Sequence, residues 1–248
     1  MLGLGLDDSV VLVTGATSGI GAATVAALLE ARARVIGFDR TPAAAHATTS
    51  REHDGWRFVA GDVTRQSDVD AAVAEALARF GRLDAVVHCA GITDDGVVWK
   101  LTDAQWQHVL DVNLTGSFRV VRATLPRLRE AGGGAIVLVA SINGLRGKFG
   151  QANYAASKAG VIALAKTAAI EGGRYGVRVN AVAPGFVRTP MTARLPLDQQ
   201  QRAHDETPLG RFAEPADIAD PILFLCSPLA RHVTGIVLRV DGGQCTAA

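Results

Sequence analysis

Short runs of apolar, largely β-branched residues alternate with longer stretches of helical periodicity along the whole chain. The apolar runs predict strands, which are Val10–Thr14, Arg34–Asp39, Trp56–Ala60, Ala85–Cys89, Ala135–Ala140, Arg178–Pro184 and Ile236–Val240. Strands that are apolar throughout are buried on both faces, which favours a parallel sheet covered by helices on each side. With right-handed crossovers, this pattern predicts an α/β fold with a doubly wound parallel sheet of about seven strands.

Helical stretches separate the strands, and one long segment fits neither pattern. The predicted helices are Gly19–Ala31, Pro42–Thr49, Ser67–Phe80, a helix from about Thr102, Leu114–Glu130, Asn153–Tyr175 and Glu214–Leu225. Phe186 to Phe212 carries three prolines and no steady period, so we expect a substrate-binding loop or lid over residues 186–212. Because no second domain or linker is evident, residues 1–248 are expected to form a single domain.

The composition narrows the class of protein. The 248 residues are 48% hydrophobic and 20% charged, which suits a large buried core and argues against disorder. A net charge of +1 argues against a general nucleic-acid surface, and no apolar stretch approaches the ~18 residues of a membrane span. The start of the chain lacks the features of a secretory signal. Cys89, Cys226 and Cys245 have no metal-like spacing, so we expect reduced thiols in a cytoplasmic protein and no metal site.

A glycine-rich segment connects the first predicted strand to the first helix. Thr14 to Gly21 reads TGATSGIG. Glycines there permit a tight turn and let the backbone approach a pyrophosphate, which the N–H groups and dipole of the helix N-terminus would stabilise. An ordinary glycine-rich connection is the alternative, but the strand–loop–helix context favours a dinucleotide site.

The end of the second strand bears on the choice of dinucleotide. Asp39 lies close to the expected interval after the glycine loop, where a carboxylate binds the adenosine ribose and repels a 2′-phosphate. This predicts NAD as the cofactor. Arg40 keeps NADP open as the less favoured alternative, because an arginine there can accommodate the phosphate. Asp62 and Val63 follow the third strand, where they either frame the adenine ring or form a simple turn.

The segment from Ser141 to Gly160 reads SINGLRGKFGQANYAASKAG and carries a second candidate site. Tyr154 and Lys158 are four residues apart, so on a helix they share one face, although a solvated face is the alternative. A nearby ammonium favours the phenolate, which predicts a Tyr154 pKa below the usual ~10 and proton transfer near neutral pH. Ser141, at a strand end, would hydrogen-bond a substrate oxygen and stabilise developing negative charge.

Together these motifs resemble the short-chain dehydrogenases/reductases, or SDRs. The matching motifs cover essentially the whole chain in the family's order and are TGATSGIG, Asp62–Val63, Ala90–Gly91, Asn113, Ser141, Tyr154-x-x-x-Lys158 and Pro184–Gly185. The stretch NGLRGKFGQANYAASKAG is similar to 3-oxoacyl-thioester reductases, the group with β-ketoacyl-carrier-protein and acetoacetyl-CoA reductases. The resemblance implies a single-domain Rossmann-like fold, usually assembled as a homotetramer.

The resemblance also implies roles for individual residues. The implied catalytic set is Asn113, Ser141, Tyr154 and Lys158, in which Lys158 also holds the nicotinamide ribose and Asn113 positions a water. The implied cofactor-binding set is Thr14, Gly15, Ser18, Gly19, Ile20, Gly21, Asp39, Asp62, Val63, Ala90, Gly91, Tyr154, Lys158, Pro184, Gly185, Val187 and Thr189.

The chain departs from the family pattern at two places. The family commonly has Asn-Asn-Ala-Gly after the fourth strand, where this chain has His88-Cys89-Ala90-Gly91. We interpret His88 as a hydrogen-bonded strand histidine, since no metal-like spacing accompanies it. Carrier-protein reductases have basic residues at the positions of Gly132 and Tyr175, whereas Arg129 and Arg174 lie nearby but shifted, which argues against a carrier-bound substrate.

The sequence therefore predicts an NAD(H)-dependent oxidoreductase that transfers a hydride between nicotinamide and a secondary alcohol or ketone by a Ser-Tyr-Lys mechanism. A small-molecule substrate is the expected partner, with no nucleic acid or membrane. The substrate pocket is expected to draw on Asn143, Leu145, Phe149, Gln151, Phe186 and the loop through Met191. Two alternatives are an NADPH-dependent reductase of 3-oxoacyl-CoA or acyl-carrier-protein thioesters and a non-catalytic nucleotide-binding protein. Compact cyclic alcohols, sugars and dihydrodiols are rival substrates.

Overall fold

One parallel sheet organises the computed structural model, which describes residues 3–41 and 54–246. The strands are β1 Val10–Thr14, β2 Arg34–Asp39, β3 Trp56–Ala60, β4 Ala85–His88, β5 Gly134–Val139, β6 Val177–Pro184 and β7 Val237–Val240. Their order in the sheet is β3-β2-β1-β4-β5-β6-β7, and every neighbouring pair runs parallel. From β1, strands β2 and β3 extend the sheet in one direction, and strands β4 to β7 extend it in the other. This order confirms the predicted doubly wound fold.

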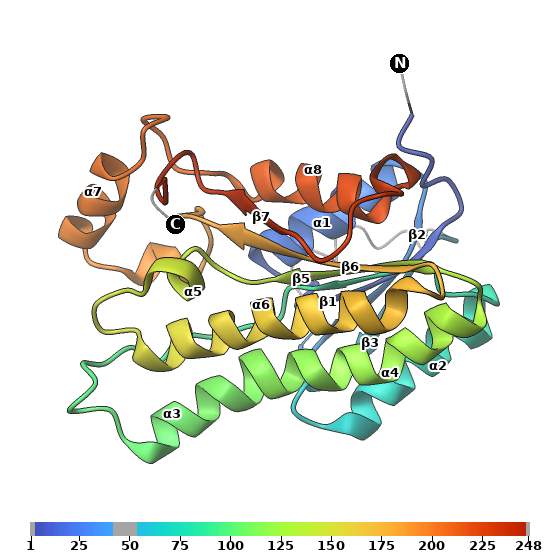
Figure 1. Ribbon diagram of the computed structural model, residues 1–248, viewed down its shortest axis with the longest axis horizontal. Helices are drawn as coiled ribbons and strands as arrows, with labels where there is room; N and C mark the ends of the chain where they lie inside the picture. Colours follow the sequence, from blue (N-terminus) through green and yellow to red (C-terminus); the bar gives the residue numbers. More distant parts are fainter. Residues whose placement is uncertain (1–2, 42–53, 247–248) are drawn as a thin grey trace.

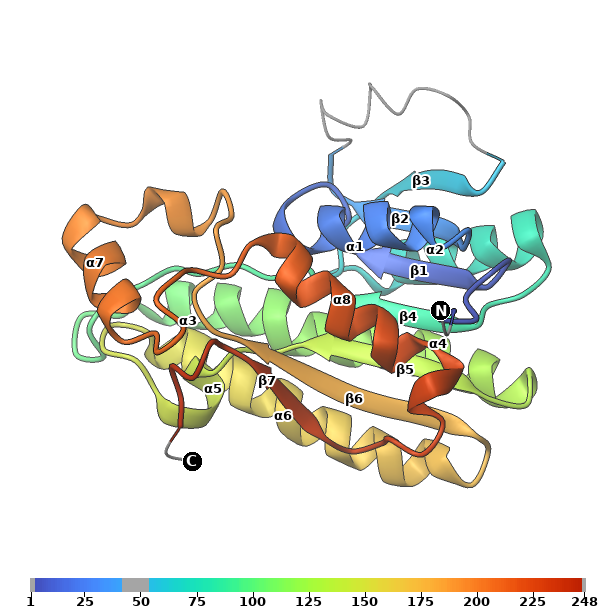
Figure 2. The same ribbon diagram turned by 90° about the horizontal axis from the view of Figure 1, so that it is seen from above.

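Helices cover both faces of the sheet, as Figures 1 and 2 show. The helices are α1 Gly19–Glu30, α2 Gln66–Phe80, α3 Asp103–Leu110, α4 Gly116–Glu130, α5 Asn143–Arg146, α6 Ala152–Gly173, α7 Leu197–Asp205 and α8 Pro215–Cys226. Helices α1 and α8 pack on one face, whereas α2, α4 and α6 pack on the other. No helix within the two described segments is long and apolar enough to cross a membrane.

The central strands are apolar because each of their faces meets a separate core. In β1, Leu12 packs with the core under α2, α4 and α6, whereas Val11 and Val13 pack with the core under α1 and α8. Successive side chains of a strand point to opposite faces, so a strand covered on both sides needs an apolar residue at every position. The run of apolar residues at Val10–Thr14 is thus explained by its place in the middle of the sheet.

The structure corrects the prediction for residues 186–212. The segment is not irregular throughout, because it contains α7 and a short 3₁₀ turn at Thr192–Arg194. Only Ala203 of α7 is buried, so this polar helix lacks the apolar stripe by which a surface helix is recognised in a sequence. Helix α5 was not predicted, and the helix predicted at Pro42–Thr49 lies outside the described residues.

The carboxyl ends of the strands gather at one edge of the sheet, and α7 lies at that edge (Figure 2). Strands β1 and β4 are neighbours at the position where the strand order changes direction. In open α/β sheets a crevice forms outside the carboxyl ends at this switch point, and ligands bind there. The fold thus places the glycine loop after β1 and the residues after β4 and β5 beside one crevice.

Candidate active site

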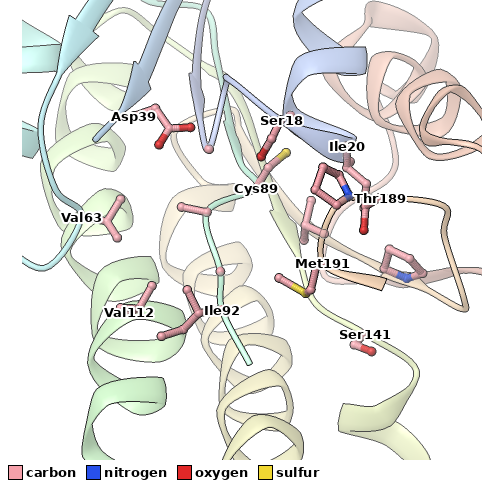
Figure 3. Close-up of a pocket in the computed structure, with 18 of the residues that line it drawn as sticks. Ser18, Ile20, Asp39, Val63, Cys89, Ile92, Val112, Ser141, Thr189 and Met191 are labelled. Atoms are coloured by element: carbon pink, nitrogen blue, oxygen red, sulfur yellow. The ribbon is translucent and has the colours of Figure 1, made fainter. Parts of the chain in front are cut away.

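A cavity of about 310 Å³ opens at this edge of the sheet. Figure 3 shows Asp39 and Val63 on one side of it and Ser141 and Met191 on the other. Nearly all residues predicted to bind the cofactor line the cavity, and they are Gly15, Ser18, Gly19, Ile20, Gly21, Asp39, Asp62, Val63, Ala90, Gly91, Tyr154, Lys158, Pro184, Gly185, Val187 and Thr189. Thr14 and Asn113 are completely buried and do not line it.

The glycine loop is shaped for close contact with the start of the segment after β4. Gly15 has a φ of +66°, and a Cβ atom there would lie 2.8 Å from the backbone nitrogen of Ala90, so a side chain would collide. Ser18 precedes α1 but caps none of its N–H groups with its side chain. The first turn of α1 therefore keeps free donors facing the cavity, which fits the pyrophosphate of a dinucleotide.

Thr14 supports the loop from behind the cavity. Its hydroxyl lies 2.7 Å from Nδ1 of His88 and accepts a hydrogen bond from the Ala90 N–H at 3.3 Å. His88 is buried, and its other ring nitrogen has no partner among the described residues. Burial and the charge of Lys158 lower the pKa of His88 to about 3, so the imidazole is neutral at physiological pH. The interpretation of His88 as a hydrogen-bonded strand histidine thus holds for one of its two nitrogens.

Asp39 and Asp62 present their carboxylates at the end of the cavity nearest β2 and β3. Asp39 accepts hydrogen bonds from the hydroxyl and N–H of Thr17 through Oδ2, and from the Arg40 N–H through Oδ1. Burial of Asp62 is outweighed by hydrogen bonds from Thr64 and by the charges of Arg40 and Arg65, which together lower its pKa. Asp39 is therefore fixed in place, and the charge of Arg40 acts on Asp62.

Asn113 ties the segment after β4 to α6 from beneath the cavity floor. It lies in a π-helical turn, Asp111–Thr115, that joins α3 to α4. Its carboxamide accepts the Ile92 N–H at 2.8 Å and donates to the Ile92 carbonyl and the Ser157 hydroxyl, both at 3.0 Å. These bonds orient the backbone beside Gly91, and the role of Asn113 in positioning a water stays a prediction.

Ser141 and Tyr154 meet where the cavity passes into a second one. Ser141 follows β5, and its hydroxyl is hydrogen-bonded to the phenol of Tyr154, which projects from α6. The predicted direction of the Tyr154 pKa is wrong for this structure. Burial and the negative charge of Asp95 raise the pKa above its ordinary value, and the Ser141 hydrogen bond offsets only part of this. The sequence showed the nearby lysine but not the depth at which the phenol lies.

Lys158 is directed at the sheet as well as at the tyrosine. Its ammonium donates a hydrogen bond to the Val139 carbonyl at 2.8 Å and lies 5.7 Å from the centre of the Tyr154 ring. The side chain is 4% exposed, and burial lowers its pKa to about 8. Lys158 therefore supplies a buried positive charge at the floor of the cavity, between the strand end and the phenol.

A second cavity of about 140 Å³ adjoins the Ser141–Tyr154 pair. Of the residues predicted for the substrate pocket, Asn143, Phe149, Gln151, Phe186 and Met191 line it, whereas Leu145 does not. Phe149 is nevertheless 83% exposed, so it stands at the rim rather than within. Helix α5, which begins at Asn143, packs closely on α6. A Cβ atom at Gly144 would lie only 2.7 Å from the backbone carbon of Lys158, so the glycine leaves room for this contact. The cavity is thus placed to hold a substrate next to the proton-handling pair.

The comparisons with known proteins agree with this geometry. A family model described as enoyl-(acyl carrier protein) reductase matches residues 15–244. Acetoacetyl-CoA reductase from Synechocystis sp. is 44% identical over 247 residues, which are 99% of this chain and 100% of that protein. The chain belongs to the short-chain dehydrogenases/reductases. As an SDR, it is an NAD(P)-dependent oxidoreductase of alcohols and ketones, so the non-catalytic alternative is not supported.

Other relatives of this SDR match over nearly the whole chain. The 3-oxoacyl-[acyl-carrier-protein] reductase FabG from Thermotoga maritima is 40% identical over 242 residues, covering 96% of this chain and 98% of that protein. The crystal structure of gox2181 has a TM-score of 0.92 and 37% sequence identity, and the match covers 98% of both chains. These similarities confirm the predicted resemblance to 3-oxoacyl-thioester reductases.

Several lining residues of this SDR were missed by sequence reasoning. Cys89, predicted within a strand, follows β4 and lines the first cavity, where burial raises the pKa of its thiol to about 12. Asp95 lines the second cavity, and its place shortly after a strand end could have identified it. Ile92, Val112 and Gln244 were also missed, whereas Leu195, Gln199 and Ala203 lie within the segment 186–212 that was predicted to bind substrate.

Proposed function

We propose that this SDR interconverts a ketone and a secondary alcohol with NAD(H), and that a 3-oxoacyl thioester is its leading ketone substrate. The observation that carries the proposal is the junction of the two cavities, where Ser141, Tyr154 and Lys158 lie together. The names of the two relatives above support the thioester, since one is an acetoacetyl-CoA reductase and the other a 3-oxoacyl-[acyl-carrier-protein] reductase.

The residues at the junction divide the proton chemistry between them. When bound, the nicotinamide supplies or accepts the hydride. Tyr154 gives its phenolic proton to the carbonyl oxygen during reduction, and Ser141 donates a hydrogen bond to the same oxygen as negative charge develops. The phenol of Tyr154, whose pKa burial raises, is protonated near neutral pH. This protonation state suits the proton donor of the reduction, and the reverse oxidation uses the same group as the acceptor.

Asp39 supports NAD over NADP. Its carboxylate is held by Thr17 at the end of β2, where it would repel a 2′-phosphate. The charge of Arg40 acts on the Asp62 carboxylate, which competes with a phosphate for the guanidinium. We therefore expect kcat/KM to be higher with NADH than with NADPH on a common ketone. An advantage of about tenfold or more for NADPH would overturn the NAD assignment, because that corresponds to about 1.4 kcal/mol of discrimination.

The substrate class can be tested with a panel read by nicotinamide absorbance. Acetoacetyl-CoA is expected to have a higher kcat/KM than cyclic ketones and keto sugars, because two relatives are named as reductases of acetoacetyl-CoA and of 3-oxoacyl-[acyl-carrier-protein]. The thioester proposal fails if a cyclic ketone or a sugar is reduced more efficiently. Reduction of none of these ketones with either cofactor would contradict the wider proposal.

A carrier-bound thioester is a second candidate, and one contact favours it. The guanidinium groups of Arg129 and Arg174 lie 4.3 Å and 4.7 Å from the ring centre of Tyr175. The two arginines, which are displaced in sequence from the family's basic positions, therefore meet at the Tyr175 ring. Two positive charges close together fit the surface of an acidic carrier protein. Acetoacetyl-carrier protein should then give a lower KM than acetoacetyl-CoA, and Arg129→Ala should abolish that difference without changing kinetics on the CoA thioester.

Assembly as a homotetramer in the cytoplasm is also proposed. Phe118 on α4 and Ile170 on α6 are 44% and 82% exposed, and β7 leaves one edge of the sheet unpaired within the described strands. Exposed apolar groups and open strand edges are features that association covers. Cys89, Cys226 and Cys245 are free thiols, which fits a reducing compartment. Light scattering after size-exclusion chromatography tests the tetramer, and a monomer mass would refute it.

A further inference from the structure

A chain of hydrogen bonds runs along the wall of the second cavity from Asp95 to Ser141. Oδ2 of Asp95 accepts a bond from Nε2 of Gln151 at 2.8 Å. Oε1 of Gln151 accepts one from Nδ2 of Asn143 at 2.9 Å. The Asn143 N–H then donates to the Ser141 hydroxyl oxygen at 3.1 Å. A carboxylate after β4 is thereby connected to the serine that faces the reacting oxygen.

The carboxylate sets the direction of the two side-chain bonds in this chain. A carboxylate can only accept hydrogen bonds, so Gln151 must turn its NH₂ group toward Asp95 and its oxygen toward Asn143. The Ser141 oxygen accepts the third bond because a backbone N–H can only donate, so the hydroxyl proton of Ser141 remains available for Tyr154 or for a substrate oxygen. An isolated bridge between Gly96 and Gln151, with the Gly96 N–H bonded to the Gly150 carbonyl at 2.8 Å, holds the two ends of the wall together.

Asp95 is the acidic group of the second cavity among the residues described as lining it. Its side chain is exposed to solvent at the cavity, and its negative charge acts on Tyr154. No hydrogen bond within residues 3–41 and 54–246 reaches its Oδ1 atom. A substrate that enters the cavity to reach Tyr154 therefore comes close to the negatively charged Asp95 carboxylate, whose Oδ1 atom accepts no hydrogen bond from the described residues.

The cations at the same cavity are engaged elsewhere. Arg146 donates to the Gln244 carbonyl and to the Glu206 carboxylate, each at 3.0 Å. Lys148 is exposed, and its charge acts on Glu206. The adjacent Asp94 does not line the cavity. Its carboxylate is instead turned toward α3, where it accepts a hydrogen bond from Gln105. Among the described residues that line the second cavity, Asp95 thus supplies the negative charge that acts on Tyr154, and no cation is bonded to it.

We propose that Asp95 is a specificity-determining residue that selects uncharged acyl derivatives, such as esters and thioesters, over free 3-oxo acids. A free acid would bring its own carboxylate into the cavity beside the Asp95 carboxylate, and like charges repel in a partly desolvated site. A thioester or ester carries no charge at that position and avoids the repulsion. This inference rests on the proposed function, which supplies the reduction of a 3-oxoacyl group at Tyr154.

Ethyl acetoacetate and acetoacetate test the selection because they carry the same 3-oxoacyl group and differ in charge. For each enzyme, the ratio of kcat/KM for the ester to kcat/KM for the acid is measured at low ionic strength. Asp95→Asn should lower this ratio by about tenfold relative to the parent enzyme, and the effect should shrink in 1 M salt. Taking the ratio cancels any general change in catalysis, since both substrates meet the same Tyr154 and Ser141.

Asp94→Asn is the matched control, because it removes the same charge one residue away but outside the cavity. It should leave the ratio within about twofold of the parent value, since the Asp94 carboxylate is held by Gln105 on α3 and does not line the cavity, and a Coulomb interaction weakens with distance. An unchanged ratio in Asp95→Asn, or an equal fall in Asp94→Asn, would overturn the inference while the parent still reduces the ester. If the parent reduces neither ester nor thioester, the proposed function fails and the inference fails with it.

Discussion

The ammonium of Lys158 donates a hydrogen bond to the backbone carbonyl of Val139 at 2.8 Å. Val139 is the last residue of β5, and Ser141 follows two residues later. The bond therefore ties α6, which carries both Tyr154 and Lys158, to the strand end that carries the serine. Because Val139 ends a buried strand inside the sheet, the bond holds Lys158 to the core, whereas Ser141 lies in the loop that follows β5.

The burial of Lys158 predicts a pH-dependent stability. Its pKa is about 8 in the fold and 10.5 as an ordinary lysine, so between these values the unfolded chain binds a proton that the folded chain lacks. The contribution of Lys158 to the free energy of unfolding therefore rises as the pH increases from 8 to 10.5, and the full cost of burying the charge applies below pH 8.

Lys158→Met should remove this rise. Urea unfolding of parent and variant at pH 7.5 and pH 10 gives four free energies, and the double difference cancels every other titrating group. We expect the parent to gain about 1–3 kcal/mol relative to the variant at the higher pH. Parallel behaviour of the two proteins would show that Lys158 titrates as an exposed lysine does.

Tyr154→Phe should abolish turnover with little change in cofactor binding. The substitution removes the proton donor but keeps the ring, and general acid catalysis contributes about 10²–10⁴-fold to a rate. Turnover is followed by nicotinamide absorbance, and NADH binding by fluorescence titration of the same preparation. Activity within about tenfold of the parent enzyme would remove Tyr154 from the proton-donor role, provided that NADH binding shows the variant to be folded.

The sequence predicted strand positions better than it predicted the environment of side chains. β1, β2 and β3 begin and end at the predicted residues. For β1 and β2 this follows because a continuous apolar run is buried on both faces inside a sheet, whereas β3 is a partly buried edge strand. The Tyr154 pKa was predicted with the wrong sign. Spacing shows that Lys158 is near, whereas the burial that decides the shift depends on how α6 packs against β5.

Contacts between residues that are far apart in the chain could not be predicted from the sequence either. Asp95 and Gln151 are 56 positions apart, and Arg146 and the carbonyl of Gln244 are 98 positions apart. Neither pair has a local pattern, because each depends on which loops the sheet brings to the same edge. Ser141 was found because it follows β5 closely, and Tyr154 and Lys158 were found from their spacing on α6. Gln244 of the C-terminal segment was missed, and the residues of α7 were covered only by the predicted substrate-binding segment 186–212.

His88 should make the fold sensitive to acid. Its pKa is about 3 in the fold against 6.5 for an ordinary histidine, so the unfolded chain binds a proton across this window. The contribution of His88 to stability is present above pH 6.5 and is lost as the pH falls toward 3. His88→Gln keeps a polar group for Thr14 without the titration, so its stability should fall less between pH 6.5 and 4.

Exposed His232 supplies the control for this experiment. The urea midpoint of His232→Gln should follow that of the parent at every pH, whereas the curve of His88→Gln should cross it as the solution becomes acidic. Identical acid sensitivity of the parent and His88→Gln would mean that the protonated imidazole finds a partner in the fold, against the neutral form that its burial favours.

Arg146 should control how tightly the substrate is held, because it connects three segments around the second cavity. It extends from α5 to Glu206, at the end of α7, and to the carbonyl of Gln244. Arg146→Gln removes the ion pair, and we expect KM for the ketone to rise about 3- to 10-fold while kcat stays within about twofold. Ser141 and Tyr154 remain in place in this variant, so the chemical step is preserved while α7 loses its attachment to α5 and keeps its contacts with Gln244.

Arg202→Gln is the comparison, since it breaks an ion pair with Asp198 that lies wholly within α7 and on the surface. A rise in KM for Arg202→Gln as large as that for Arg146→Gln would assign the effect to the stability of α7 rather than to its attachment to α5.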